Sequence, residues 1–296
     1  MLNIISKDSK IVDKLASALN ESTKDLLTLN TKAIASEFLS TKRAVEQMEL
    51  FKDIVNEFEN YDFKKKKLLE IGAGVGTFLV VSRTKYAIEA FGVEPSSDEF
   101  SSFKEVSSAI LEEYNLPKDL ILNCVGEKLP FPDESFDLIY STNVLEHVKE
   151  PEIVISESIR VLRPGGYLQF VIPNYFSFWE GHYGIFWPCL TNKVLAKLYV
   201  GLILKNPRYV DTLNLISPGL LKKILAKHMN KIEIIDWGKN TFKKRLTEGN
   251  YSDWASLQKI RPIVELIQKL KISELVANVL NTFEMYTPIV LTLKKR

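Results

Sequence analysis

The chain has 296 residues, of which 46% are hydrophobic and 26% charged, so it has ample material for a sizeable globular core. Its 39 basic and 37 acidic residues give a formal net charge of +2, and this balance argues against a nucleic-acid partner. No apolar run approaches the roughly 18 residues of a membrane span, and the first residues lack the long apolar segment of a signal peptide. Cys124 and Cys189 have no metal or redox spacing and indicate reduced, buried thiols. We therefore expect a cytoplasmic protein.

Residues 1–62 are predicted to form an N-terminal helical extension. Ser40 and Thr41 are suited to cap the start of a helix. The helix that follows carries apolar residues at a spacing of three to four, namely Val45, Met48, Phe51, Ile54, Val55 and Phe58. Such a stripe must lie against another part of the molecule.

From about residue 63 the pattern alternates between strands and helices. Strand-like segments are Leu68–Ile71, Ala90–Val93, Leu120–Cys124, Phe136–Ser141 and Tyr167–Ile172. Helix-like segments separate them, notably 97–114 and 152–162, and the sequence Pro164-Gly165-Gly166 is expected to stop the second helix and form a turn. This alternation predicts an α/β fold with a parallel sheet covered on both faces.

After Pro173 two long segments interrupt the alternation. Residues 174–215 show no clear strand, and residues 251–281 carry an apolar helical stripe of Ile263, Leu266, Ile267, Leu270, Leu275, Val279 and Leu280. A helix over 218–229 and strands over 232–237 and 289–293 complete the chain. We expect one domain over 63–296, with both interruptions forming a helical cap after the fifth strand. The apolar stripe, near Lys259, Lys269 and Lys271, favours core packing or dimerisation and leaves peripheral membrane contact open.

The first strand runs into a glycine-rich loop, Glu70-Ile71-Gly72-Ala73-Gly74-Val75-Gly76. Glycines at such a turn let the backbone approach a bound nucleotide without an intervening side chain. Glu94 ends the next strand, 20 residues after Gly74, where its carboxylate can accept hydrogen bonds from ribose hydroxyls. The Gly-x-Gly-x-Gly spacing and the acid at Glu70 disfavour a pyrophosphate, whereas a methionine ammonium suits that acid.

At this point the chain resembles the class I S-adenosylmethionine-dependent methyltransferases, specifically their small-molecule group. The resemblance extends through 126–139, Asn143-Val144-Leu145-Glu146-His147-Val148 and 160–174. Together these segments cover roughly residues 65–175 in the order of that family. The resemblance implies a Rossmann-like, doubly wound, mainly parallel seven-stranded sheet and S-adenosylmethionine as the cofactor.

The same resemblance implies cofactor-binding roles for particular residues. Glu70, Gly72 and Gly74 hold the methionine end in a loop that Gly76 completes, and Glu94 holds the ribose. The backbone around Gly126 and Glu127 contacts the adenine, and Thr142 and Asn143 line the sulfonium. Many relatives have an acidic residue just before the position of Gly126. This chain has Val125 there, so adenine recognition rests on the backbone or on Glu127 reaching back.

Two histidines are candidates for the chemistry at the methyl acceptor. His147 follows Glu146 just after the fourth strand, and His182 lies in the loop after the fifth. In two related groups a Glu-x-x-Glu-His segment binds a divalent metal here; this chain has Asn143 in place of the first carboxylate, which weakens Glu146, His147 and His182 as metal ligands. The alternatives are a general base at His147 or His182, or a purely structural role. His228 is interpreted as a helix-end residue.

Seven aromatic residues between Tyr175 and Trp187 predict a lid over the acceptor or the packing of the cap onto the sheet. The favoured function is methyl transfer to a small-molecule or glycan-type acceptor, with a slight preference for oxygen because a hydroxyl needs a base or a metal. The alternatives are a non-catalytic scaffold and a nicotinamide-dependent oxidoreductase. No motif of the Asn-Pro-Pro-Tyr type follows the fourth strand, which disfavours a nucleic-acid methyltransferase.

Overall fold

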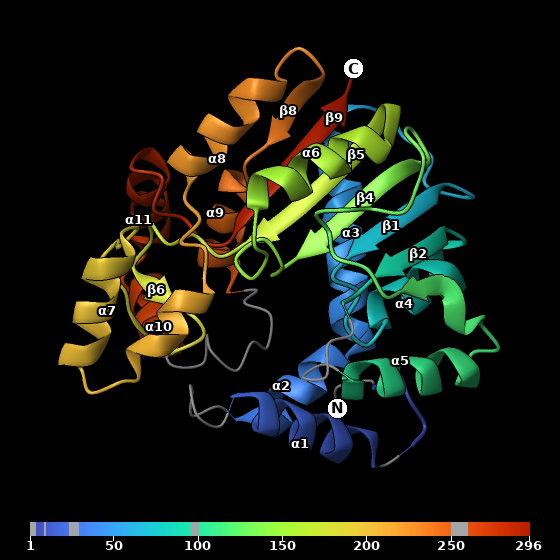
Figure 1. Cartoon of the computed structure of the whole chain (residues 1–296). Coiled ribbons are helices and arrows are strands. Elements are labelled where there is room, and N and C mark those ends of the chain that lie inside the picture. Colours follow the sequence, from blue (N-terminus) through green and yellow to red (C-terminus); the bar gives the residue numbers. More distant parts are fainter. Residues whose placement is uncertain (1–3, 9, 24–29, 96–100, 250–259) are drawn as a thin grey trace.

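A seven-stranded sheet forms the centre of the computed structural model, which describes residues 4–8, 10–23, 30–95, 101–249 and 260–296 (Figure 1). The strand order is β3-β2-β1-β4-β5-β9-β8. The strands of this sheet are β1 Lys67–Ile71, β2 Glu89–Val93, β3 Ile121–Leu122, β4 Phe136–Thr142, β5 Leu162–Ile172, β8 Ile232–Asp236 and β9 Ile289–Lys295. The first five run parallel, and β9 pairs antiparallel with both β5 and β8. The predicted mainly parallel, doubly wound sheet is therefore confirmed.

Helices cover both faces of the sheet. Their bounds are α1 Ile11–Thr23, α2 Thr31–Phe38, α3 Thr41–Phe58, α4 Thr77–Tyr86, α5 Ser101–Glu113, α6 Pro151–Val161, α7 Lys193–Leu202, α8 Pro218–Leu225, α9 Lys239–Glu248, α10 Arg261–Lys269 and α11 Ser273–Thr282. Successive strand residues point to opposite faces, as the pleat requires. Leu68 belongs to the core shared with α1 to α5, and Leu69 to the core shared with α6, α8 and α9.

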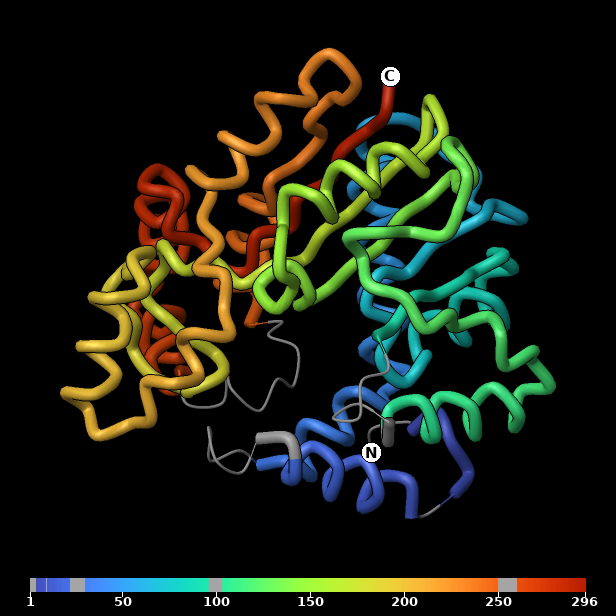
Figure 2. Tube along the Cα trace, in the orientation of Figure 1, coloured from blue at the N-terminus to red at the C-terminus, as the bar shows by residue number. Residues whose placement is uncertain are grey.

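Helix α3 carries the N-terminal apolar stripe onto the sheet. Met48, Phe51 and Val55 are buried in the same cluster as Leu68 and Tyr140, whereas Phe58 stays exposed. Ser40 caps the helix, since its hydroxyl accepts from the Arg43 amide at 3.2 Å. Thus α3 completes one face of the sheet, and α1 and α2 lie beyond it (Figure 2). The domain boundary at residue 62 remains a prediction.

The sheet departs from the expected boundaries in two places. The third strand is only Ile121–Leu122, because the short 3₁₀ helix η2, Lys118–Leu120, takes up its predicted start. Helix α6 ends at Val161, and β5 begins directly at Leu162. The ladder then jumps from Phe136↔Leu162 to Leu138↔Tyr167, so the predicted glycine turn bulges out within the strand and does not follow the helix.

Residues 174–215 form an insertion with its own small core. The expectation of no strand there was wrong, because Trp179–Glu180 (β6) pairs with Ile185–Phe186 (β7) in a hairpin. Helix α7 and the 3₁₀ helix η3, Pro207–Thr212, follow. The buried residues of this insertion are Tyr175, Tyr183, Trp187, Ala196, Val200, Val210, Leu213 and Leu215. We call this segment the first insertion.

The second predicted interruption packs elsewhere. Val264 of α10 and Ala277 of α11 are buried with the core of α8 and α9, while part of the 251–281 range lies outside the described residues. The expected single cap made of both interruptions is thus not confirmed. The stripe was expected to serve core packing or dimerisation. Core packing is wrong for Ile263, Leu266, Leu270, Leu275 and Val279, which are exposed, and dimerisation stays a prediction. Among the described residues no helix is long and apolar enough to cross a membrane. Cys124 and Cys189 are free thiols but half-buried, in contrast to the expected full burial.

Candidate active site

The glycine-rich loop joins β1 to α4 at the carboxyl edge of the parallel strands. Gly72, Gly74 and Gly76 all have positive φ, which only glycine adopts without strain. The loop is held against the end of β2, because the amides of Gly72 and Ala73 donate to the Val93 carbonyl at 2.9 and 3.1 Å. The predicted strand–loop–helix arrangement is therefore present.

Gly72 and Gly74 have different surroundings. A Cβ atom at Gly72 would lie 2.2 Å from Cγ2 of Val144, so the loop packs directly on the segment after β4. A Cβ atom at Gly74 would meet no atom of the described residues within 4 Å, so within that part of the chain Gly74 borders open space. Gly74 is thus the point where a bound nucleotide can approach the backbone.

Two carboxylates flank the glycine loop. Glu94 accepts a hydrogen bond from the Gly74 amide at 2.8 Å, and burial raises its pKa to about 7. Glu70 is buried, and its Oε2 atom has no hydrogen-bond partner among the described residues. Burial and the neighbouring Glu94 raise the pKa of Glu70. An unpartnered buried carboxylate oxygen is costly unless a cation binds it, and a methionine ammonium fits this requirement.

The predicted adenine-side residues follow β3. Gly126 has no room for a side chain, because a Cβ atom there would lie 3.1 Å from Ile71 and 3.2 Å from Val154. Glu127 is turned toward the start of α6, where its Oε1 accepts from the amides of Lys149 and Glu150. With this oxygen engaged, the predicted contact of Glu127 with adenine would have to use its other oxygen, and the predicted backbone contact stays a prediction.

Thr142 and Asn143 end β4 beside the loop. Asn143 adopts a positive φ of 53°, and its amide donates to the Val171 carbonyl at 2.9 Å. The Oγ1 atom of Thr142 and the Oδ1 atom of Asn143 are buried without a hydrogen-bond partner among the described residues. Both predicted sulfonium-lining residues therefore keep a polar atom available for a bound group.

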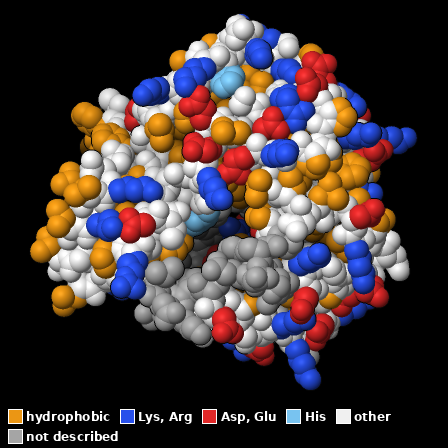
Figure 3. All heavy atoms as spheres, in the orientation of Figure 1, with side chains coloured by type: hydrophobic (Ala, Val, Ile, Leu, Met, Phe, Trp, Pro, Cys, Tyr) orange, Lys and Arg blue, Asp and Glu red, His pale blue; other side chains and the backbone are white. Residues whose placement is uncertain are grey.

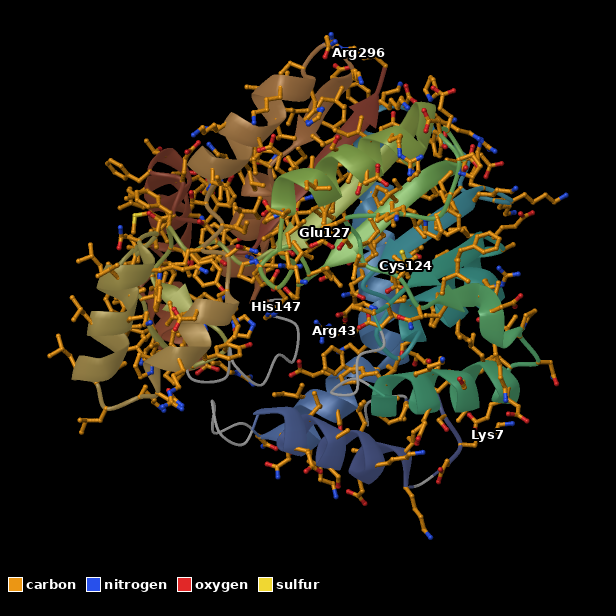
Figure 4. The ribbon with its side chains drawn as sticks, viewed as in Figure 1. Lys7, Arg43, Cys124, Glu127, His147 and Arg296 are labelled. Carbon is orange, nitrogen blue, oxygen red and sulfur yellow. The ribbon has the colours of Figure 1, made fainter. Side chains whose placement is uncertain are left out.

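The structure also brings Arg43, which the sequence did not single out, near the predicted site residues. It belongs to α3, and its guanidinium lies 3.3 Å from a carboxylate oxygen of Glu37. Figure 4 shows Arg43 and His147 bordering the same central space from opposite sides. In the space-filling view this space is a hollow with a histidine side chain at its rim (Figure 3). In the sequence Arg43 is one of three basic residues of an amphipathic helix, with Lys42 and Lys52, and nothing in that pattern distinguishes it from a surface residue.

Three predicted acceptor-side residues come together in one cluster. The side-chain ligand atoms of Glu146, His147 and His182 all lie within 4.8 Å of one another. The His147 and His182 rings are in edge contact, with centroids 5.1 Å apart. His147 is two-fifths exposed, and its buried surroundings and His182 lower its pKa.

Glu146 is fully buried among these residues. Neither of its carboxylate oxygens has a hydrogen-bond partner among the described residues, and its Oε1 atom lies 3.8 Å from Nε2 of His147. Burial raises the pKa of Glu146 to about 7. Together with two imidazoles, such a carboxylate matches the donor set of a divalent transition metal ion. The residues therefore fit either a metal ion or a proton acceptor.

Glu180 orients His182, a role that the sequence did not reveal. The Glu180 Oε1 atom lies 2.7 Å from Nδ1 of His182, and Oε2 accepts from the Tyr183 amide at 2.7 Å. Burial disfavours the charged forms of both residues, but the attraction between Glu180 and His182 outweighs it. The pKa of His182 is therefore raised and the pKa of Glu180 is lowered. With Nδ1 engaged, Nε2 is the ring nitrogen of His182 that remains to act.

Asn214 ties the two halves of this cluster together. Its side-chain amide donates to the carbonyls of Leu145 and Val148 at 3.2 and 2.6 Å, and its backbone amide donates to the Glu146 carbonyl at 2.7 Å. Asn214 lies at the end of the first insertion, whose start carries Glu180 and His182. These hydrogen bonds therefore fix the Glu146 turn relative to the insertion.

Some aromatic residues between Tyr175 and Trp187 are buried, and others are exposed. Tyr175, Tyr183 and Trp187 fill the core of the first insertion, while Phe176 and Phe186 are exposed. The ring of Tyr209 in η3 contacts the His182 ring in a tilted arrangement, with centroids 5.4 Å apart. Packing thus explains the three buried rings, though inside the insertion rather than onto the sheet. His228 ends η4, Ala226–His228, directly after α8, as interpreted.

Residues 43–207, more than half of the chain, match the profile of a family described as "Methyltransferase domain". An uncharacterized methyltransferase of Schizosaccharomyces pombe is 38% identical over 115 residues, covering 36% of this chain and 40% of that protein. Norajmaline N-methyltransferase of Rauvolfia serpentina is 30% identical over 137 residues, covering 46% and 44%. The chain thus spans roughly half or less of the length of these curated relatives.

A solved structure supports the fold. It is a phosphoethanolamine N-methyltransferase 2 of Haemonchus contortus, in complex with phosphomonomethylethanolamine and S-adenosylhomocysteine. The TM-score is 0.51 at 16% identity, over 94% of this chain and 59% of that one. At this identity the comparison concerns the arrangement of the elements and not the acceptor.

Proposed function

Because this chain belongs to the methyltransferase domain family, we propose that it transfers a methyl group from S-adenosylmethionine to a hydroxyl group of a small-molecule or glycan-type acceptor. The observation that carries the choice of a hydroxyl is the group formed by Glu146, His147, His182 and Glu180 beside the end of β4. An amine with a free lone pair needs little help to attack a methyl group, whereas a hydroxyl needs its proton removed. A buried imidazole–carboxylate group meets that need.

The cofactor side of the proposal rests on three charged residues and one glycine. Glu70 would bind the methionine ammonium through its unpartnered oxygen, and Glu94 would accept hydrogen bonds from the ribose. Arg43 lies across the hollow and would bind a carboxylate, that of the methionine end being the nearest in chemistry. Gly74 leaves the space for the nucleoside.

When bound, S-adenosylmethionine supplies a methyl group attached to a positively charged sulfur. The residues of this chain must hold the acceptor oxygen in line with that group and remove its proton. Nε2 of His182 is the proposed proton acceptor, since Glu180 holds the proton on Nδ1 in place. The imidazolium that forms is stabilised by Glu180 and Glu146. The oxygen–methyl bond replaces the sulfur–methyl bond, and S-adenosylhomocysteine is the second product.

A divalent metal ion held by Glu146, His147 and His182 is the second route to the same chemistry. The observation that favours it is the fully buried Glu146 carboxylate with both oxygens unpartnered. An ion at this position would lower the pKa of an acceptor hydroxyl, and Glu180 would orient His182 as a ligand. Residual activity after treatment with a chelator separates the two routes.

The test is a transfer assay with methyl-labelled S-adenosylmethionine and paired acceptors that differ only in hydroxyl against amine. We expect label on the hydroxyl acceptor, abolished by His182→Ala, with S-adenosylhomocysteine binding retained by calorimetry. Label on the amine that survives His182→Ala would overturn the assignment to oxygen. Failure to bind S-adenosylhomocysteine would overturn the methyltransferase activity itself.

A further inference from the structure

The first insertion exposes an apolar surface on the side opposite its core. Helix α7 buries Ala196 and Val200, yet its outer face presents Val194, Leu195, Leu198 and Leu202 to solvent. Leu202 is 81% exposed, and Leu204, just after the helix, is 95% exposed. Phe186 of the hairpin joins them, since its carbonyl accepts from the Tyr199 hydroxyl of α7 at 2.7 Å. We call these six exposed residues the α7 face.

A second exposed apolar set lies on α10 and α11. It consists of Ile263, Leu266, Leu270, Leu275 and Val279. In Figure 1 these helices and α7 occupy the same edge of the molecule, and apolar side chains crowd that edge in Figure 3. Exposed apolar surface of this extent marks an interaction site rather than ordinary surface.

The charge around the α7 face indicates which kind of partner binds there, a second copy of the chain or a lipid surface. Residues 193–212 contain four basic side chains, Lys193, Lys197, Lys205 and Arg208, and one acidic side chain, Asp211, which pairs with Lys197 at 2.8 Å. This segment contributes +3, whereas the whole chain has +2, so the rest of the protein has a net charge of −1. Lys205 and Arg208 form no ion pair with another described residue, and neither do Lys269 and Lys271 beside the second set. The basic charge is therefore concentrated where the leucines project.

This combination disfavours a second copy of the chain. A twofold interface places the same surface on both partners, so the lysines would face lysines. An anionic lipid surface instead neutralises them while its acyl region receives the apolar side chains. The projection of Leu202 and Leu204 from a helix end also suits insertion into a bilayer surface better than a flat contact.

We propose that the α7 face, together with the exposed side of α10 and α11, docks the protein on an anionic lipid bilayer. The hairpin that carries Phe186 also carries Glu180, so the docked face adjoins the acceptor side of the site. The acceptor class that follows is a hydroxyl on a lipid-linked molecule, a step that rests on the proposed function.

The test is sedimentation of the full chain with phosphatidylglycerol–phosphatidylcholine vesicles and with pure phosphatidylcholine vesicles. We expect binding to the anionic vesicles that is at least tenfold stronger and weakens at high salt. Leu198→Gln with Leu202→Gln, and separately Lys205→Glu with Arg208→Glu, should each abolish it. Ile153→Gln on α6 and Lys64→Glu with Lys65→Glu are matched controls, because these residues are also exposed but lie elsewhere.

Absence of sedimentation with anionic vesicles would overturn the proposal. So would a dimer in solution that the leucine substitutions dissociate, or equal binding by the control and α7 variants. Because vesicle binding requires neither cofactor nor acceptor, its failure is distinguishable from failure of methyl transfer. Vesicle binding together with methylation of a water-soluble hydroxyl acceptor, but not of a lipid-linked one in the same vesicles, would contradict the acceptor class alone.

Discussion

The cofactor side and the acceptor side of the hollow are built in different ways. The cofactor side comes from one short stretch, in which the loop Gly72–Gly76 and Glu94 are joined by the hydrogen bond from Gly74. The acceptor side combines Glu146 after β4, Glu180 and His182 in the hairpin, and Asn214 at the end of the first insertion. The two sides meet where Gly72 packs on Val144.

This difference separates recognition of the cofactor from choice of the acceptor. A local loop at the rigid edge of the sheet holds one ligand. Insertions that vary among proteins of one fold can surround the same edge and serve different acceptors. Variants on one side should therefore leave the other side's readout unchanged. The four predictions that follow test this independence, beginning with the largest effect.

Substitution His182→Ala should lower turnover by about 10²–10⁴-fold, because it removes the proposed proton acceptor. The affinity for S-adenosylhomocysteine, measured by calorimetry, should not change. His228→Ala, at the end of η4 and outside the site, is the matched control and should keep full turnover. A parallel loss of cofactor affinity in His182→Ala would show that the two sides are coupled.

Substitution Glu94→Ala should weaken binding of S-adenosylhomocysteine by about 1.5–3 kcal/mol, the value of hydrogen bonds to a charged group. Glu89→Ala, at the exposed start of β2, controls for a general effect on that strand. Calorimetric titration measures both. Equal affinity in wild type and Glu94→Ala would remove Glu94 from the cofactor site.

Substitution Asn214→Ala should destabilise the fold by about 1–3 kcal/mol, because the carbonyls of Leu145 and Val148 lose their donor. Turnover should fall further than stability explains, since the Glu146 turn is released, and cofactor affinity should hold. Thermal unfolding and kinetics report the two effects, with the exposed Asn230→Ala as control. Equal turnover of wild type and Asn214→Ala at a temperature where both are folded would contradict a positioning role of Asn214.

The pH dependence of cofactor binding gives the smallest expected effect. With the pKa of Glu94 raised to about 7 in the unliganded protein, affinity should fall about tenfold from pH 8 to pH 6 as the carboxylate takes up a proton. Stability of the unliganded protein should change in the opposite direction. A raised folded pKa means that stability present below pH about 4.5 is lost as the pH rises through 7.

Glu94→Gln separates these two trends. It should flatten the pH dependence of affinity between pH 6 and 8, and it should reduce the loss of stability over pH 5–7. The remaining dependence of stability on pH is assigned to Glu70 and Glu146, whose pKa values are also raised. An affinity profile in Glu94→Gln that still falls tenfold would assign the titration to another group.

Some features of the fold and site were accessible from residue order because they are local. The alternation of strands and helices predicted the parallel sheet, and the spacing from Gly74 to Glu94 predicted a carboxylate at the glycine loop. One boundary error has a cause outside the local sequence. The pair Gly165-Gly166 predicts a turn correctly, but pairing of Leu162 with Phe136 extends β5 ahead of it.

Sequence by itself determined the family, the sheet and the cofactor loop, because period, glycine spacing and strand ends are properties of neighbouring residues. Only the tertiary structure decided which distant side chains meet. Glu180 and His182 reach Glu146 because Asn214 fastens the far end of a 42-residue insertion to the turn after β4, and no spacing along the chain encodes that contact. Tertiary packing also decided that α7 buries one apolar face and leaves the other exposed, since both faces of that helix carry leucine, valine or alanine.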